Sequence, residues 1–141
     1  MEYRVFQEDI ALRLDVGDEV TACIEEVCRL ENIQLGTVSG LGAVSHAVLG
    51  LYQVSSKTYL ENSLNGDMEM VSLTGNITRK DGQPYLHLHA SFGDASARTF
   101  GGHLKKAVIS VTGEIWIHRV SGWIGRKTDP ATGLNIMDFG D

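Results

Sequence analysis

The chain has 141 residues, 43% of them hydrophobic and 21% charged, which is the balance of a globular protein with one core and excludes a disordered chain. Its net charge of −6 argues against a broad nucleic-acid-binding surface, because neutralising phosphates requires clustered Lys and Arg. Its sixteen glycines predict many turns and close backbone contacts, and hence a β-rich fold.

Residues 3–7 and 10–14 are predicted as short strands. The one strong helix signal follows at about residues 17–32, where apolar residues recur at helical spacing and form one stripe: Val20, Ile24, Val27 and Cys28. Asp15 is expected to cap the free backbone N–H groups of this helix. Asn32 is expected to end it in the left-handed conformation.

Residues 33–52 are apolar, β-branched and rich in glycine, and we expect two strands that meet near residues 40–45. Gly40-x-Gly42 resembles part of a phosphate-binding loop, but it lacks the third glycine and a following helix. Close approach of neighbouring backbones is the better explanation for these glycines.

A β-hairpin is predicted next, with strands at residues 68–78 and 85–92 joined by a turn at Asp81-Gly82. A shorter strand is expected at residues 57–60, and Asn65-Gly66 is a second tight-turn signal.

The strand at residues 85–92 alternates strictly, so that polar residues share one of its faces: Tyr85, His87, His89 and Ser91. The two imidazoles stand about 6.6 Å apart along the strand and can converge on one ion. A short polar loop and Gly101-Gly102, which lets the backbone turn freely, then bring in His103. Three neutral imidazoles are a common ligand set for zinc, with water in the fourth place. The alternative is two histidines on a solvated strand face and a third in an unrelated loop.

Residues 107–120 predict a further strand, on which Glu114 and His118 share a face. Glu114 and Asp94 are the candidates for an acid or base beside a metal, although an exposed strand carboxylate is the simpler explanation of Glu114. His118 is interpreted as structural.

The basic pairs of the chain are each interpreted as solvated charge: Arg79-Lys80, Lys105-Lys106 and Arg126-Lys127. The tail at residues 121–141 is polar with a few apolar anchors.

These elements predict an α+β fold, a mostly antiparallel sheet or half-barrel with the helix of residues 17–32 packed across it, in a single domain of residues 1–141. A sheet of this kind has edges that must be covered, for example by oligomerisation. The N-terminus has no signal-peptide pattern and no apolar run approaches membrane length. Cys23 and Cys28 are expected to be free thiols, so we expect a cytoplasmic protein without membrane contact.

Five segments together resemble the PPC domain, the "plants and prokaryotes conserved" domain, over nearly the whole chain. They are Gly17-Asp-Glu-Val20, Thr37-Val-Ser-Gly-Leu-Gly-Ala-Val44, Gly66-Asp-Met-Glu-Met-Val-Ser-Leu-Thr-Gly-Asn-Ile77, His87-x-His89 and Gly101-Gly-His-Leu104.

The resemblance implies a compact domain that assembles as a homotrimer. In prokaryotic members the histidines corresponding to His87, His89 and His103 form a metal site, usually taken as zinc. The resemblance also implies a predicted DNA-binding role, taken from plant members that carry an AT-hook, and hence DNA or a DNA-binding protein as a partner. No Arg-Gly-Arg-Pro-type core of an AT-hook is present in this sequence.

The first functional hypothesis is therefore a homotrimer that binds zinc or another divalent metal. The alternative is a zinc-dependent enzyme that acts on a small carbonyl or oxo-acid bound at the metal, by analogy with the fold and histidine site of acetolactate decarboxylase. The sequence leaves open whether the metal is catalytic or structural.

Overall fold

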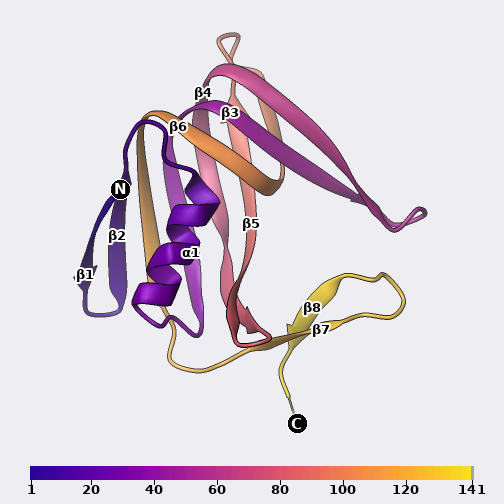
Figure 1. The fold of residues 1–141 in the computed structure, drawn as a ribbon. Helices are drawn as coiled ribbons and strands as arrows, with labels where there is room; N and C mark the ends of the chain where they lie inside the picture. The colour runs from indigo at the N-terminus through magenta and orange to yellow at the C-terminus, as the bar shows by residue number, and fades with distance from the viewer. Residues whose placement is uncertain (141) are drawn as a thin grey trace.

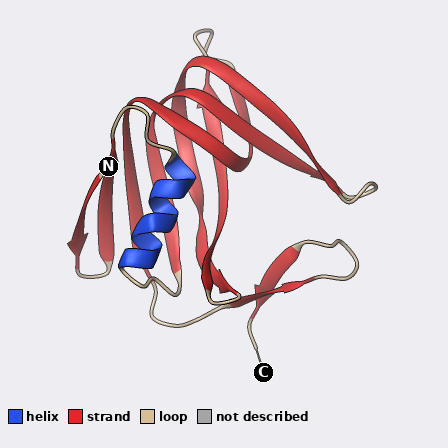
Figure 2. Cartoon of the chain, viewed as in Figure 1, coloured by secondary structure: helices blue, strands red, loops and turns tan. Residues whose placement is uncertain are grey.

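The computed structural model describes residues 1–140, and these form one helix and eight strands (Figure 1). In chain order the elements are β1 (Glu2–Phe6), β2 (Asp9–Leu14), α1 (Val20–Leu30), β3 (Gly36–Gln53), β4 (Thr58–Lys80), β5 (Gln83–Gly93), β6 (Thr99–Arg119), β7 (Gly125–Thr128) and β8 (Asn135–Asp138). Six strands form one antiparallel sheet in the order β1-β2-β6-β3-β4-β5, and β7 and β8 form a separate hairpin (Figure 2). This confirms the predicted fold class, a mostly antiparallel sheet with one helix.

The sheet curls because β6 pairs with three other strands. The second half of β6 lies between β2 and β3, whereas its first half lies between β3 and β5. The strands β3, β4, β5 and the first half of β6 therefore close into a small ring, which makes this end of the molecule a half-barrel.

The core lies between the sheet and α1, which crosses one face of the sheet in Figure 1. The predicted apolar stripe of the helix is fully buried there, at Val20, Ile24, Val27 and Cys28. Alternate residues of the central strands meet it, including Phe92, Leu88, Ile115 and Ile117. The other face of the sheet carries the alternate residues of the same strands, because successive residues of a strand point to opposite faces. It holds the polar side chains around the histidines and also exposed apolar residues such as Trp116. We refer to it as the outer face.

The helix begins later than predicted. Glu19, and not Asp15, is the N-cap, and its carboxylate accepts hydrogen bonds from the backbone N–H groups of Thr21 and Ala22 at 3.1 and 2.8 Å. The same carboxylate accepts a bond of 3.1 Å from the backbone N–H of Ala107 on β6, so it joins the helix to the sheet. Asn32 follows the helix with φ +47°, as expected of a left-handed stop.

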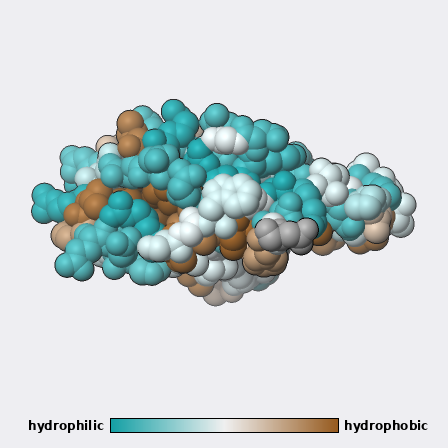
Figure 3. All heavy atoms as spheres, turned by 90° about the horizontal axis from the view of Figure 1, so that it is seen from below, coloured by the Kyte–Doolittle hydropathy of each residue, from teal (hydrophilic) through white to brown (hydrophobic). Residues whose placement is uncertain are grey.

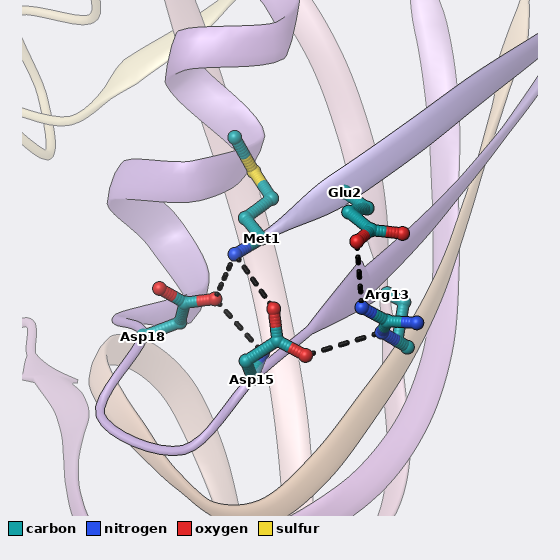
Figure 4. A network of polar contacts seen from close by, with 5 residues as sticks. All are labelled: Met1, Glu2, Arg13, Asp15 and Asp18. Atoms are coloured by element: carbon teal, nitrogen blue, oxygen red, sulfur yellow. Dashed lines mark hydrogen bonds and ion pairs between the residues drawn. The ribbon is translucent and has the colours of Figure 1, made fainter.

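Asp15 instead belongs to an ion network at the N-terminus (Figure 4). The Met1 amino group lies 3.0 Å from Asp15 and 2.8 Å from Asp18, and Arg13 bridges Asp15 and Glu2. Hydrogen bonds to Asp18 and Asp15 raise the pKa of the amino group to about 10. The network fixes β1 against the loop that leads into α1.

At two places where the sequence predicted a turn between separate strands, the structure has one long strand with a bend. Residues 36–53 form one strand, β3, and residues 58–80 form one strand, β4, with register shifts where turns were expected. Asn65-Gly66 is a β-bulge rather than a turn, and Gly66 has φ +106°. A Cβ at Gly42 would lie 2.5 Å from the carbonyl oxygen of Thr112, which confirms close backbone approach as the reason for glycine there.

The Asp81-Gly82 turn is confirmed, with φ values of +50° and +77° that match the two-residue hairpin turn. The tail forms the β7–β8 hairpin, which was not predicted, and the backbone N–H of Arg79 donates to the carbonyl of Ile124 where the tail reaches the sheet. Among the described residues, no helix is long and apolar enough to cross a membrane.

Replacing Glu19 with Ala should lower the free energy of unfolding by about 1–3 kcal/mol, because it removes the helix cap and the partner of the Ala107 N–H. Chemical denaturation measures this. The control is Glu25→Ala on the exposed face of α1, where a surface change should stay within about 0.5 kcal/mol. Equal stability of the two variants would contradict the role assigned to Glu19.

Candidate metal centre

Three imidazoles converge on the outer face of the half-barrel. His87 and His89 project from β5 and His103 projects from the first half of β6, where it is the cross-strand partner of His89. The ring centroids lie 5.3 Å apart for His87–His89, 5.3 Å for His87–His103 and 5.6 Å for His89–His103. One ligating nitrogen from each ring lies within 4.8 Å of the other two.

Backbone pairing on both sides of β5 produces this arrangement. The pairing with β4 is tight at Gly75, where a Cβ would lie 2.1 Å from the carbonyl oxygen of His87. The pairing with β6 differs from the prediction, because Gly101-Gly102 lies within the strand and makes no turn. The chain reverses earlier, at Asp94–Arg98, where the carboxylate of Asp94 accepts bonds from the Arg98 side chain and from two backbone N–H groups.

The surroundings favour neutral imidazoles. Burial, followed by the neighbouring His87, His89 and Lys105, lowers the pKa of His103 to about 4. Burial also lowers the pKa of His87, with His89 and Arg126 adding to the effect. A neutral imidazole has a lone pair free for a metal ion, so both rings are in the ligating form near neutral pH.

The donor set fits a zinc-like ion. Zinc–nitrogen bonds of about 2.0–2.1 Å in tetrahedral geometry place ligating nitrogens about 3.3–3.4 Å apart, so modest ring rotations from 4.8 Å would suffice. Three ligands of one face leave the remaining coordination position on the solvent side, where His89 is exposed. The three-histidine group could therefore hold a metal ion.

Two residues that the sequence did not single out surround His103. The ring of Tyr59, from β4, lies 5.4 Å from the ring of His103. The Lys105 ammonium lies 4.1 Å from the Tyr59 ring centre and 4.0 Å from a carboxylate oxygen of Glu61. Tyr59 thus limits how far His103 can turn, and Lys105 has an acidic partner.

Arg126 of β7 lies on the other side of the centre, and it is not the solvated charge that was expected. Its guanidinium is partly buried and donates to Asn76 at 2.7 Å, to Thr78 at 2.8 Å and to the carbonyl of Asn135 at 3.2 Å. It also lies 4.8 Å from the centre of the Tyr85 ring.

An open hollow of about 260 Å³ adjoins His89 on the same face. Ser72, Thr74 and Ser91 are among the residues that line it.

The structure does not bring the two candidate carboxylates to the histidines. Glu114 lies on the second half of β6, three strand spacings or about 14 Å from β5 along the sheet. Asp94 is engaged in its turn, and the Arg98 guanidinium lowers its pKa. His118 bonds to Asp9 at 2.8 Å, in agreement with a structural role.

Comparison with known proteins identifies relatives of this chain. The model of the "Plants and Prokaryotes Conserved (PCC) domain" matches residues 1–121, and this is the family that the motifs resemble. A solved "putative DNA binding protein" from Bacteroides thetaiotaomicron is 30% identical with a TM-score of 0.95, over 98% of this chain and 96% of that one. A "metal-containing protein" from Archaeoglobus fulgidus is 34% identical with a TM-score of 0.86, over 96% and 95% of the two chains.

More distant comparisons concern larger proteins. The bifunctional protein GlmU of Synechococcus sp. (strain JA-3-3Ab) is 35% identical over 125 residues, and the chain spans 19% of that protein's length. Acetolactate decarboxylase from Bacillus subtilis subspecies spizizenii matches with a TM-score of 0.59 and 15% identity, over 86% of this chain and 56% of that one. This last likeness shows a shared fold alone.

The lowered pKa values of His103 and His87 give the stability of the metal-free protein a definite pH dependence. The unfolded imidazole has a pKa of about 6.5, so the unfolded state takes up protons first, and the free energy of unfolding should fall as the pH falls from about 6.5 towards 4. Chemical denaturation in chelator at about pH 7 and pH 5 should show a smaller fall for His103→Gln than for the wild type. His46→Gln, outside the cluster, should behave as the wild type, and an unchanged slope in His103→Gln would contradict the assignment.

Proposed function

The chain belongs to the plants and prokaryotes conserved domain family, and we propose that it is a zinc-binding member that assembles as a homotrimer. The observation that carries the proposal is the convergence of three imidazoles, all from strands, on one point of the outer face. His87, His89 and His103 are the proposed ligands. The name of the Archaeoglobus relative, a metal-containing protein, agrees with this.

Zinc is the proposed ion because of the ligand chemistry. Imidazoles suit zinc and other late divalent transition metals, whereas magnesium and calcium require oxygen ligands. No Asp, Glu or Cys of residues 1–140 joins the cluster to supply such an oxygen or a thiolate. A set of three histidines with one position left open is typical of zinc sites that bind a further molecule.

The trimer is supported by uncovered apolar side chains and by an open sheet edge. Apolar residues reach the surface of the face shown in Figure 3. On the outer face, Trp116 and Phe6 are each 50% exposed, and their rings lie 6.4 Å apart. Phe6 is the last residue of β1, the edge strand of the sheet, so the exposed pair adjoins this edge. Uncovered apolar surface and a free edge both favour contact with another copy.

We also infer that residues 1–141 form one domain, although the family match ends at residue 121. Arg126 hydrogen-bonds to two side chains of β4, and Tyr52 of β3 donates a hydrogen bond to the carbonyl of Thr132. The tail hairpin is thus tied to the same half-barrel that carries the histidines.

DNA is the partner suggested by the name of the Bacteroides relative. The charge of this chain favours a small ligand instead, because the net charge is −6 and duplex binding depends on Lys and Arg contacts to phosphates. The partly buried Arg126 donates a hydrogen bond to Asn76, the cross-strand partner of His87, and is not part of an exposed basic surface.

Metal analysis of the purified protein should find about one zinc per chain. His87→Ala, His89→Ala and His103→Ala should each lose most of it, because two imidazoles bind zinc far more weakly than three. His46→Ala, whose histidine bonds to Asn65 outside the cluster, should keep the wild-type content.

Light scattering on the same samples should give about three times the chain mass of 15.4 kDa. A monomer mass would contradict the proposed trimer but would not contradict the proposed metal site. A zinc content equal to that of the wild type in the His87, His89 and His103 variants would contradict the proposed metal site.

A zinc-dependent enzyme is the second candidate, favoured by the solvent-facing coordination position and by the hollow beside His89. A zinc ion with an open position polarises a bound carbonyl oxygen or lowers the pKa of bound water. The expected substrate is a small carbonyl compound or oxo-acid, because the hollow holds about 260 Å³.

The zinc-loaded wild type should therefore consume at least one compound of a carbonyl and oxo-acid panel, and His89→Ala should be inactive. His46→Ala is again the control. A zinc-loaded protein that leaves the whole panel unchanged would contradict an enzymatic role and would leave the binding function standing.

A further inference from the structure

Arg126 is a partly buried cation without a carboxylate partner among residues 1–140. All three of its side-chain hydrogen bonds go to neutral oxygens, those of Asn76, Thr78 and Asn135. Of the other basic residues near the tail and the centre, Lys127 is paired with Asp138 at 3.0 Å and Lys105 with Glu61 at 4.0 Å. Lys80 donates to the side-chain oxygen of Asn135 at 3.0 Å. A charge that has been moved out of water is costly unless something neutralises it, so this one is available to an anion.

The guanidinium lies next to the metal centre. Asn76, which accepts its hydrogen bond of 2.7 Å, is the cross-strand partner of His87. Directly opposed residues of an antiparallel pair have Cβ atoms about 4.5–5.5 Å apart. Tyr85, whose ring lies 4.8 Å from the guanidinium carbon, is two residues from His87 on the same face of β5. Both contacts place Arg126 beside the first of the three histidines.

The guanidinium is also held in position and keeps donors to spare. An arginine has five N–H donors in a rigid fork, and three of them are used here. Its bonds to β4 and its position over the Tyr85 ring hold the fork in place. The remaining two N–H groups suit a carboxylate, which arginine binds more strongly than a neutral oxygen.

We propose that Arg126 is the anion-recognising residue of the three-histidine centre, and that the two together bind a small carboxylic acid with a carbonyl or hydroxyl oxygen on the adjacent carbon. The carboxylate would lie against Arg126 and the second oxygen would face the metal position. The proposal rests on the proposed function, because it requires a metal at the histidines. Arg126 lies outside residues 1–121, so it is a feature of this chain beyond the family match.

The charge of the chain favours a carboxylate over a larger oxyanion. A chain with a net charge of −6 repels polyanions more strongly than a singly charged ligand. A single negative charge is also what one unpaired guanidinium can neutralise.

The test compares two probes of nearly equal shape, pyruvate and its neutral amide, by calorimetric titration of the zinc-loaded protein. The wild type should bind pyruvate about tenfold more tightly or better, as expected for a charge-assisted pair. Arg126→Gln should bring the ratio close to one without changing the zinc content. Lys127→Gln removes a charge from the same hairpin and should keep the wild-type ratio.

A second variant separates recognition from folding, because Arg126→Gln also weakens the attachment of the tail. Asn76→Asp keeps the shape and the acceptor for the 2.7 Å bond but supplies the missing carboxylate partner. It should retain the folded hairpin, with a thermal midpoint at least as high as that of the wild type, and still lose the preference for pyruvate.

The outcomes distinguish the two proposals. If the wild-type protein carries no zinc, both the proposed function and the inference about Arg126 are contradicted. A zinc-loaded wild type that binds both probes equally overturns the role of Arg126 alone, as does an Arg126→Gln or Asn76→Asp variant that keeps the wild-type ratio.

Discussion

The pairing of β5 with the first half of β6 is the constraint on which the candidate centre depends. His89 and His103 are direct cross-strand partners, and His87 lies on the same face one period away. A slip of one residue in this pairing would turn His103 towards the opposite face. The slip is opposed by the core, because Leu104 follows His103 and is buried against the half-barrel interior. The packing that stabilises the fold therefore also sets the position of the third imidazole.

One face of the sheet carries the hydrophobic core and the other carries the candidate metal centre. Helix α1 and the apolar side chains of β5 and β6 bury one face, which leaves the polar residues of the same strands on the other. The long strands β3 and β4 continue beside the first half of β6, and this pairing brings Tyr59 to His103. Partial burial lowers the pKa values of His87 and His103 and so keeps these two imidazoles neutral, which makes the fold less stable in acid. The fold thus builds a partly enclosed polar site without interrupting its core.

Local patterns predicted the strand that carries His87 and His89, whereas the strand position of His103 and the rest of the site depended on contacts between distant segments. The alternation around His87 and the Asp81-Gly82 turn are short-range signals, and counting back from that turn pairs Asn76 with His87. Gly101-Gly102 was taken for a turn because glycine permits one, whereas the chain reverses at Asp94, whose bonds to Arg98 and to backbone N–H groups close the loop. The prediction that Asp15 caps the helix was wrong for a similar reason. Glu19 caps the helix and also accepts a hydrogen bond from the backbone N–H of Ala107, 88 residues away.

Arg126 had no signal of this kind, since a basic pair in a polar tail is usually solvated and its partners on β4 are about fifty residues earlier in the chain. Its position separates the proposed ligand-selecting residue from the metal ligands along the chain. The three histidines lie within residues 1–121, the segment that matches the family, whereas the residue that would select the ligand comes from the hairpin beyond it. A hairpin attached mainly by side-chain hydrogen bonds can change its sequence without disturbing the core. The charge placed beside the metal position can then change independently of the metal ligands, because the two are carried by segments with different structural roles.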